Sequence, residues 1–210
     1  MGPRGDVSPK TDVTGGATEF ERARLYGEAV ARGALDLVRG GQFPVGEGVK
    51  LSSTSFTQCI TNQNFLMAAS IGCMDYDMLS GTGCPSTGLW GPKNISSQVA
   101  YLRLGTQVQA AVLPGEALTR MSIDGVGAAG FPSSSGSIKT TMKAPVKMVL
   151  GMSTDFLGYF VPEDEWNSPK ASKNPGNSDY EEGVSLGGSM ANTWLRDRVK
   201  SLITQDNATF

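Results

Sequence analysis

Ser8 is the first residue of this chain that could do covalent chemistry. It lies in Gly5-Asp6-Val7-Ser8-Pro9-Lys10, where glycine permits unusual backbone angles and proline holds the preceding residue extended. This geometry could present the hydroxyl as a nucleophile, although an ordinary polar turn has the same residue types. A serine nucleophile usually takes its base from histidine, and the chain has no histidine. A Ser-His-Asp triad and a histidine-containing zinc site are therefore excluded within this chain.

Two further segments carry side chains that could bind a ligand. Glu116 follows Pro114-Gly115 at a predicted strand-to-helix turn, where the helix dipole could equally explain a carboxylate. Tyr180 lies in a polar loop, where it could contact a ligand or simply cover the surface. The sequence contains neither a phosphate-binding loop nor a dinucleotide-binding fingerprint.

The three cysteines, Cys59, Cys73 and Cys84, leave their redox state open. Cys73 and Cys84 flank a turn-rich loop that a disulfide could close, and the odd count would leave one thiol over. Three reduced thiols are the alternative. Their spacing matches no zinc site.

Composition predicts an ordinary globular domain. Of the 210 residues, 39% are hydrophobic and 18% are charged, and the net charge of −2 does not favour nucleic acid or anionic membranes. There is no stretch of about 20 apolar residues that would predict a transmembrane helix. We expect a single domain over residues 1–210.

Helical periodicity appears near both ends of the chain. Thr18 is a suitable N-cap for a first helix, and Gly40-Gly41 would end it. A second amphipathic helix is predicted near the C-terminus from the spacing of Leu186, Met190, Trp194, Leu195, Val199, Leu202 and Ile203.

Between these helices the pattern predicts strands. Residues 99–116 read as a hairpin around Gly105-Thr106, and residues 145–152 and 156–162 are apolar strand candidates. A short helix is expected over residues 117–126 and a long loop over residues 163–183. Residues 42–98 read as mostly irregular apart from a strand at residues 49–56. The fold class is therefore a mixed α/β fold, a layered sheet with flanking helices and long irregular loops.

The order of these segments resembles one family. The chain runs from GDVSP through the helix FERARLYGEAVARGALDLV to paired strands ending in PGE, then to VPEDEW and YE. This order resembles the later part of the catalytic domain of the neutral/alkaline, non-lysosomal ceramidase family. The resemblance covers most of the chain except residues 42–98.

The resemblance implies a function and a site. Members of this family are zinc amidohydrolases that cleave the N-acyl bond of ceramide, so the implied substrate is an N-acyl lipid. Ser8 would be the catalytic serine, and Glu116 and Tyr180 would be zinc ligands. A secreted or cell-surface location is expected.

The chain departs from the family at two points. The family's zinc-binding histidines precede GDVSP and have no counterpart here, and Lys10 stands where the family usually has asparagine. We therefore expect a segment or second polypeptide that carries histidines to complete the zinc site. The chain would then be one piece of a divided enzyme or a fragment; otherwise it is a diverged homologue without the metal.

Two other functions remain open. The chain could be a non-catalytic extracellular structural or assembly subunit. It could form a homo-oligomer, with the Gly/Ser/Thr/Asn-rich residues 42–98 making subunit contacts. It could also bind carbohydrate or lipid head groups through the rings of Trp90, Trp166 and Trp194.

Overall fold

The computed structural model describes residues 18–41, 46–73, 78–86, 91–123, 136–161, 180–186 and 189–210. The chain divides into two compact units. One comprises residues 5–45, and the other, called the body, comprises residues 1–4 and 46–210. The prediction of one domain over residues 1–210 stays a prediction, because compactness does not show whether a unit folds independently. Within the described ranges, no helix is both long and apolar enough to span a membrane.

Helix α1, Glu19–Gly40, forms the described part of the first unit. Thr18 precedes it in an extended conformation, and its hydroxyl accepts a hydrogen bond from the Glu21 amide at 3.2 Å. This cap satisfies an amide that has no partner within the helix. The helix ends before Gly41, so the predicted start and end of this helix are confirmed.

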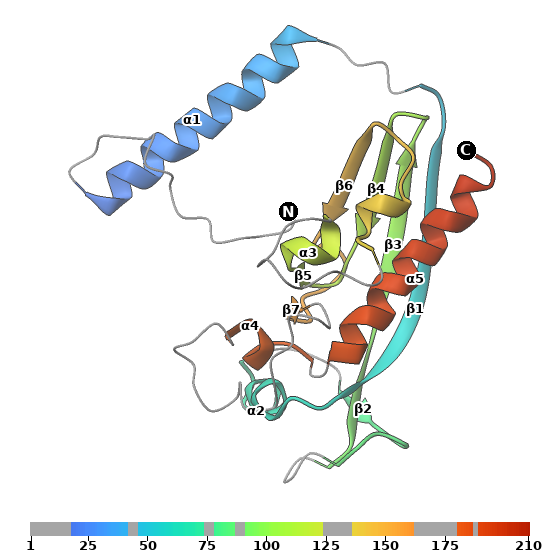
Figure 1. Cartoon of the computed structure of the whole chain (residues 1–210). Coiled ribbons are helices and arrows are strands. Elements are labelled where there is room, and N and C mark those ends of the chain that lie inside the picture. Colours follow the sequence, from blue (N-terminus) through green and yellow to red (C-terminus); the bar gives the residue numbers. More distant parts are fainter. Residues whose placement is uncertain are drawn as a thin grey trace. The chain divides into compact units, whose positions relative to one another are not determined.

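The body is built on a five-stranded mixed sheet (Figure 1). Four strands run in the order β1-β3-β4-β6, and β2 pairs with part of β3. The strands are antiparallel except for the parallel pair β4 and β6. Their bounds are β1 Val49–Ile60, β2 Leu79–Ser80, β3 Lys93–Leu104, β4 Val108–Val112 and β6 Val146–Leu150. A separate parallel pair joins β5, Glu116–Ala117, to β7, Tyr159–Phe160.

Helices flank this sheet, which confirms the predicted mixed α/β fold class. The longest helix of the body, α5, contacts β1, β3 and β4, and it runs along one face of the sheet (Figure 1). The described helices of the body are α2 Gln63–Ser70, α3 Thr119–Ser122, the 3₁₀ helix η2 Lys139–Thr141, α4 Tyr180–Gly183 and α5 Ser189–Asn207.

The core lies between α5 and the sheet. Leu195, Val199 and Ile203 recur every four residues along α5 and are almost completely buried. They belong to one apolar cluster with side chains of β3 and β4, including Val99 and Ala111. This spacing places all three helix residues on one face, as the amphipathic pattern predicts.

On the opposite face of the sheet, the two outer strands β1 and β6 expose apolar side chains. Residues paired across neighbouring strands lie on the same face of a sheet. Val49 and Leu51 are 73% and 71% exposed, and Val146 and Met148 are exposed as well. We name as the open sheet face two rows that cross the four strands, Val49, Leu104, Val108 and Val146, then Leu51, Leu102, Ala110 and Met148.

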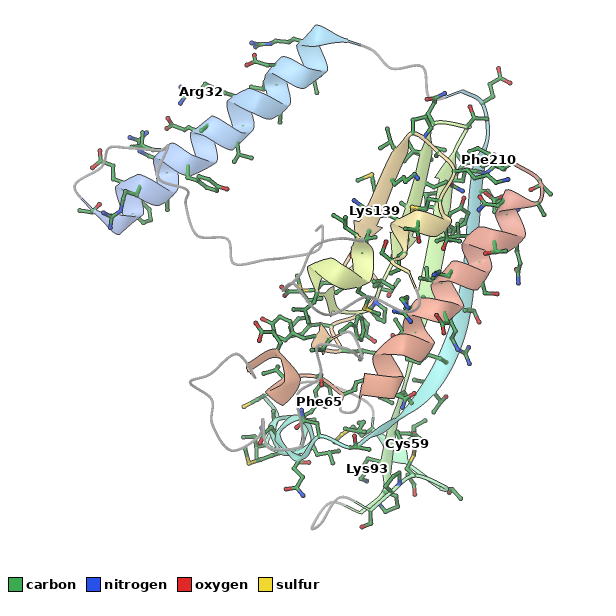
Figure 2. The ribbon with its side chains drawn as sticks, viewed as in Figure 1. Arg32, Cys59, Phe65, Lys93, Lys139 and Phe210 are labelled. Carbon is green, nitrogen blue, oxygen red and sulfur yellow. A yellow bond between two sulfur atoms is a disulfide. The ribbon has the colours of Figure 1, made fainter. Side chains whose placement is uncertain are left out.

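A disulfide joins Cys59 to Cys84, and Cys73 is a free, exposed thiol. Cys59 lies near the end of β1 (Figure 2), and Cys84 lies in the turn after β2. The suggested Cys73–Cys84 bridge and the all-reduced alternative are therefore both wrong. Because β1 and β2 both pair with β3 at Asn94, the sheet brings Cys59 and Cys84 together across a separation of 25 residues.

Three local predictions differ from the structure. Residues 42–98 are more regular than predicted, because β1 continues to Ile60, α2 follows it, and β3 begins at Lys93. The helix predicted over residues 117–126 is preceded by β5 and starts at Thr119. The loop predicted over residues 163–183 ends in α4, while residues 162–179 lie outside the described part of the chain.

Candidate functional site

Glu116 is a buried carboxylate on a short strand. It starts β5, and only 7% of the residue is exposed. Its amide donates to the Gly158 carbonyl at 2.9 Å, and it lies opposite Tyr159 of β7. The alternative interpretation of Glu116 as the first residue of a helix is wrong, because strand pairing with β7 holds it in extended backbone.

Close backbone contacts fix the turn that carries Glu116. A Cβ on Gly115 would lie 2.5 Å from the Gly158 carbonyl oxygen and 2.9 Å from the Phe160 ring. A Cβ on Gly151 would lie 2.8 Å from the Gly115 carbonyl oxygen. Real Cβ atoms do not approach other atoms so closely, so both positions require glycine.

The backbone beside this turn is strained. Met152 has a φ of 52°, in the left-handed region that side chains other than glycine rarely adopt. Its amide donates to the Gly115 carbonyl at 3.0 Å, and the Leu157 amide donates to Pro114 at 2.7 Å. Such strain persists only where surrounding contacts enforce it, and it is common at functional sites. The turn before Glu116 is therefore held on one side by residues 151–152 and on the other by residues 157–158.

The segment after Tyr180 lies on the other side of β7. Gly158 forms an isolated bridge with Ser185, and the Tyr159 amide donates to the Val184 carbonyl at 3.3 Å. A Cβ on Gly158, which has a φ of +79°, would lie 1.8 Å from the Val184 carbonyl oxygen. Strand β7 thus connects the strand that begins with Glu116 to the segment that follows helix α4.

The structure therefore describes the predicted site only in part. Glu116 and the backbone of Tyr180 lie on elements that both contact β7. The side chain of Tyr180 lies outside the described residues, and so does all of Ser8. Trp90 and Trp166 are outside them as well, as is the ring of Trp194, so binding through these rings stays a prediction.

The residues present would fit only part of a zinc site. Glu116 and Tyr180 could each supply an oxygen ligand, whereas protein zinc sites usually have three or four ligands with nitrogen or sulfur among them. Among the described residues, no group of three or more His, Cys, Asp and Glu could hold a metal ion. Because the chain contains no histidine, any imidazole ligand would have to come from elsewhere.

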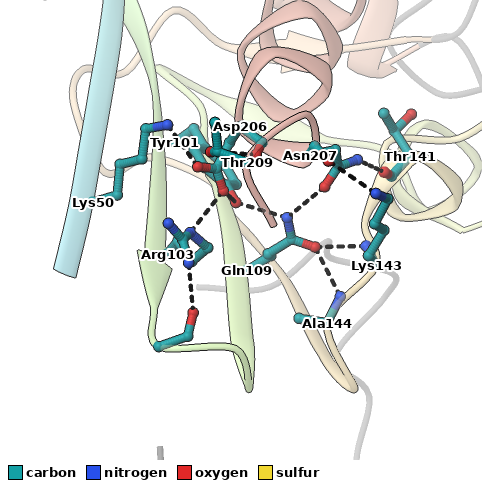
Figure 3. Close-up of polar contacts among 11 residues, drawn as sticks. Lys50, Tyr101, Arg103, Gln109, Thr141, Lys143, Ala144, Asp206, Asn207 and Thr209 are labelled. Atoms are coloured by element: carbon teal, nitrogen blue, oxygen red, sulfur yellow. Dashed lines mark hydrogen bonds and ion pairs between the residues drawn. The ribbon is translucent and has the colours of Figure 1, made fainter. Parts of the chain in front are cut away.

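Sequence reasoning missed a buried polar cluster beneath the end of α5 (Figure 3). Asp206, which is 1% exposed, accepts a hydrogen bond from the Tyr101 hydroxyl at 2.6 Å. Its two oxygens also pair with Lys50 Nζ at 2.7 Å and Arg103 Nε at 2.8 Å. One carboxylate on α5 is therefore bonded to both β1 and β3.

Gln109 of β4 extends this cluster. Its side-chain nitrogen donates to the Tyr101 hydroxyl at 2.7 Å and to Asn207 at 3.0 Å. Its oxygen accepts from the amides of Lys143 and Ala144 at 2.6 and 2.9 Å. These contacts hold elements together and leave no side-chain group of Gln109 aimed at a ligand, so the cluster is structural.

The pKa values of the two acids in this cluster shift in opposite directions. Burial raises the pKa of Tyr101 above its usual value, and its hydrogen bond to Asp206 raises it further. Burial also favours protonation of Asp206, but hydrogen bonds from Lys50 and Tyr101 and the charge of Arg103 outweigh it and lower its pKa. One signal in the sequence could have indicated this cluster. Tyr101 and Arg103 are two residues apart in the predicted hairpin, so both polar side chains lie on the same face of the strand.

Comparison with known proteins found no matching family model, no matching curated protein and no matching solved structure.

Proposed function

We propose that this chain is part of a zinc-dependent amide hydrolase of the ceramidase type, which cleaves the N-acyl bond of N-acylsphingosine or a related lipid. The observation that carries the proposal is Glu116, a buried carboxylate that directly follows a turn that only glycine permits, beside strained backbone. The strand next to Glu116 contacts α4, which begins with Tyr180. The order of GDVSP, PGE and YE in the sequence supports the same assignment.

Each residue has a role in this proposal. Glu116 and Tyr180 would hold the metal through their side-chain oxygens, and Ser8 would supply the nucleophilic hydroxyl. Zinc, when bound, would polarise the amide carbonyl. A segment or second polypeptide would supply the missing histidines. The disulfide between Cys59 and Cys84 is compatible with the secreted or cell-surface location that we propose.

Two variants test the role of Glu116. With the histidine-bearing polypeptide present, Glu116→Gln should weaken Zn²⁺ binding at least about tenfold in calorimetric titration, because it replaces a charged ligand with a neutral amide. Glu47→Gln, the same change at an exposed residue of the body, should leave binding unchanged. Hydrolysis of a fluorescent N-acylsphingosine, measured with zinc and the histidine-bearing polypeptide, should fall with Glu116→Gln alone. Equal binding and hydrolysis by both variants would refute the proposal.

A non-catalytic assembly subunit is the second candidate, and the open sheet face favours it. Its two rows are apolar and uncharged, so a second copy of this chain could cover them without burying a charge. This candidate requires a dimer in solution and no Zn²⁺ binding. Sedimentation velocity decides the first point, and a monomer would rule this candidate out.

A further inference from the structure

Asn62 makes four side-chain hydrogen bonds at the junction of three elements. It follows β1, and its side-chain oxygen caps α2 by accepting from the amides of Asn64 at 2.9 Å and Phe65 at 3.4 Å. Its side-chain nitrogen donates to the carbonyls of Gly183 at 2.9 Å and Ser185 at 2.8 Å. Both donors and both acceptor positions of the amide are therefore used.

The second pair of hydrogen bonds spans a long sequence distance. Gly183 and Ser185 are 121 and 123 residues from Asn62, and Gly183 is the last residue of α4. The backbone amides of Thr61 and Asn62 also donate to the Leu186 carbonyl, at 3.0 and 3.3 Å. The two residues that follow β1 thus hold residues 183–186 through four hydrogen bonds.

Residues 183–186 are held from the other side by β7. The bridge between Gly158 and Ser185 and the bond from the Tyr159 amide to Val184 make this second attachment. Ser185 is completely buried and Leu186 is 3% exposed, so the segment has little room to shift. Because β7 also pairs with β5, the position of α4 relative to Glu116 depends on both attachments.

We infer that Asn62 is a positioning residue, which holds α4 so that Tyr180 is correctly placed relative to Glu116. The inference rests on the proposed function, because that function gives Tyr180 its part in the reaction. The attachment of residues 183–186 to Asn62 does not depend on the proposed function. An asparagine is needed because one side chain must accept from two amides and donate to two carbonyls. Serine, aspartate or threonine could cap α2 as well but could not make both donations.

Asn62→Asp separates the two roles of this side chain. Aspartate is an equally good helix cap, so α2 should keep its start. It has no donor, however, and its carboxylate would face the carbonyls of Gly183 and Ser185. Asn64→Asp is the matched control, because it adds the same charge two residues later on an exposed side chain.

The first measurement is hydrogen exchange followed by mass spectrometry. In Asn62→Asp, peptides covering residues 180–186 should exchange at least about tenfold faster, while those covering residues 63–70 should be unchanged. Asn64→Asp should match the wild type in both regions. Unchanged exchange over residues 180–186 in Asn62→Asp would overturn the inference.

The second measurement reports on Tyr180 itself and needs no metal. In protein labelled with 3-fluorotyrosine, the ¹⁹F resonance lost on Tyr180→Phe belongs to Tyr180. We expect one sharp resonance in the wild type and in Asn64→Asp, and a shifted or broadened one in Asn62→Asp. An identical resonance in all three proteins would show that Asn62 does not position Tyr180.

The third measurement links Asn62 to zinc through a double-mutant cycle. Introduced into the wild-type protein, Asn62→Asp should weaken Zn²⁺ binding several-fold. Introduced into Tyr180→Phe, it should have no further effect. Additive effects would mean that Asn62 does not act through Tyr180, which refutes the positioning role. If the wild type binds no Zn²⁺ in the presence of the histidine-bearing polypeptide, the proposed function fails, while exchange and ¹⁹F spectra still decide whether Asn62 positions Tyr180.

Discussion

At the scale of single residues, Asp206 joins helix α5 to two strands of the sheet. Its carboxylate is almost completely buried and contacts a phenol, an ammonium and a guanidinium. Lys50 is 39% exposed and Arg103 is 21% exposed, so water can partly compensate these cations if Asp206 is lost. The contribution of Asp206 is therefore smaller than that of a fully buried ion pair.

Asp206→Asn should lower the free energy of unfolding by about 2 kcal/mol at neutral pH, because hydrogen bonds to a charged group are lost. Urea denaturation measures this change. Glu47→Gln is the control, because it removes a charge from an exposed side chain of the body, and it should change stability by less than about 0.5 kcal/mol. Similar losses in both variants would contradict a special role for Asp206.

The pH dependence of this effect follows from the pKa of Asp206. Folding lowers this pKa below its usual value of 3.8, so the ionised carboxylate stabilises the native state. The stabilisation is fully present above pH 3.8 and is lost as the pH falls through the lower, folded pKa. The stability difference between the wild type and Asp206→Asn should therefore shrink in acid below this value. A difference that stays constant down to pH 2 would contradict the prediction.

At the scale of elements, the disulfide connects β1 to the turn that follows β2. Gly81 lies within this turn, where a Cβ would lie 2.8 Å from the Lys93 backbone and 3.0 Å from Cys84. The turn is therefore packed directly against the first residue of β3. A covalent bond at this point stabilises the end of the sheet that β4 and β6 do not reach.

Replacing Cys59 and Cys84 together with serine should lower the free energy of unfolding by about 2–4 kcal/mol. The bond closes a loop across 25 residues and restricts the unfolded chain. Cys73→Ser should change stability by less than about 0.5 kcal/mol, because Cys73 is free and exposed. Thermal denaturation with and without reductant measures both effects, and a reductant-sensitive wild type with an insensitive double variant is expected.

At the scale of the whole molecule, the body has one covered and one exposed sheet face. Helix α5 covers the face that carries Val99 and Tyr101, whereas the open sheet face exposes Val49 and Leu51. Large contiguous patches of exposed apolar surface often mark contact sites in soluble proteins. The exposure of the open sheet face in solution can be tested directly.

Leu51→Ala and Leu113→Ala make the same chemical change at opposite extremes of burial. Because Leu51 is 71% exposed, Leu51→Ala should lower the free energy of unfolding by less than about 1 kcal/mol. Because Leu113 is completely buried, Leu113→Ala leaves a cavity and should lower the free energy of unfolding by about 2–5 kcal/mol. Urea denaturation compares the two. Equal losses would show that the face around Leu51 is covered in solution.

Sequence reasoning succeeded where local contacts decide the structure. The cap at Thr18 and the hairpin around Gly105-Thr106 both depend on neighbours within a few residues, and both are present. It failed at β5, because two residues carry no detectable alternation and their partner strand begins 43 residues later, at Tyr159 against Glu116. It also failed at α4, whose neighbour Asn62 is distant in the chain.

The amino-acid sequence by itself determined the mixed α/β class, the two long helices and the absence of histidine, since these follow from local periodicity and composition. Only the tertiary structure decided that Cys59 pairs with Cys84, that Asp206 of α5 pairs with residues of two strands, and that Glu116 is buried in a strand. Each of these depends on segments far apart in the chain. Such contacts form only when the sheet assembles, because strand register and packing, rather than local propensity, select the partners.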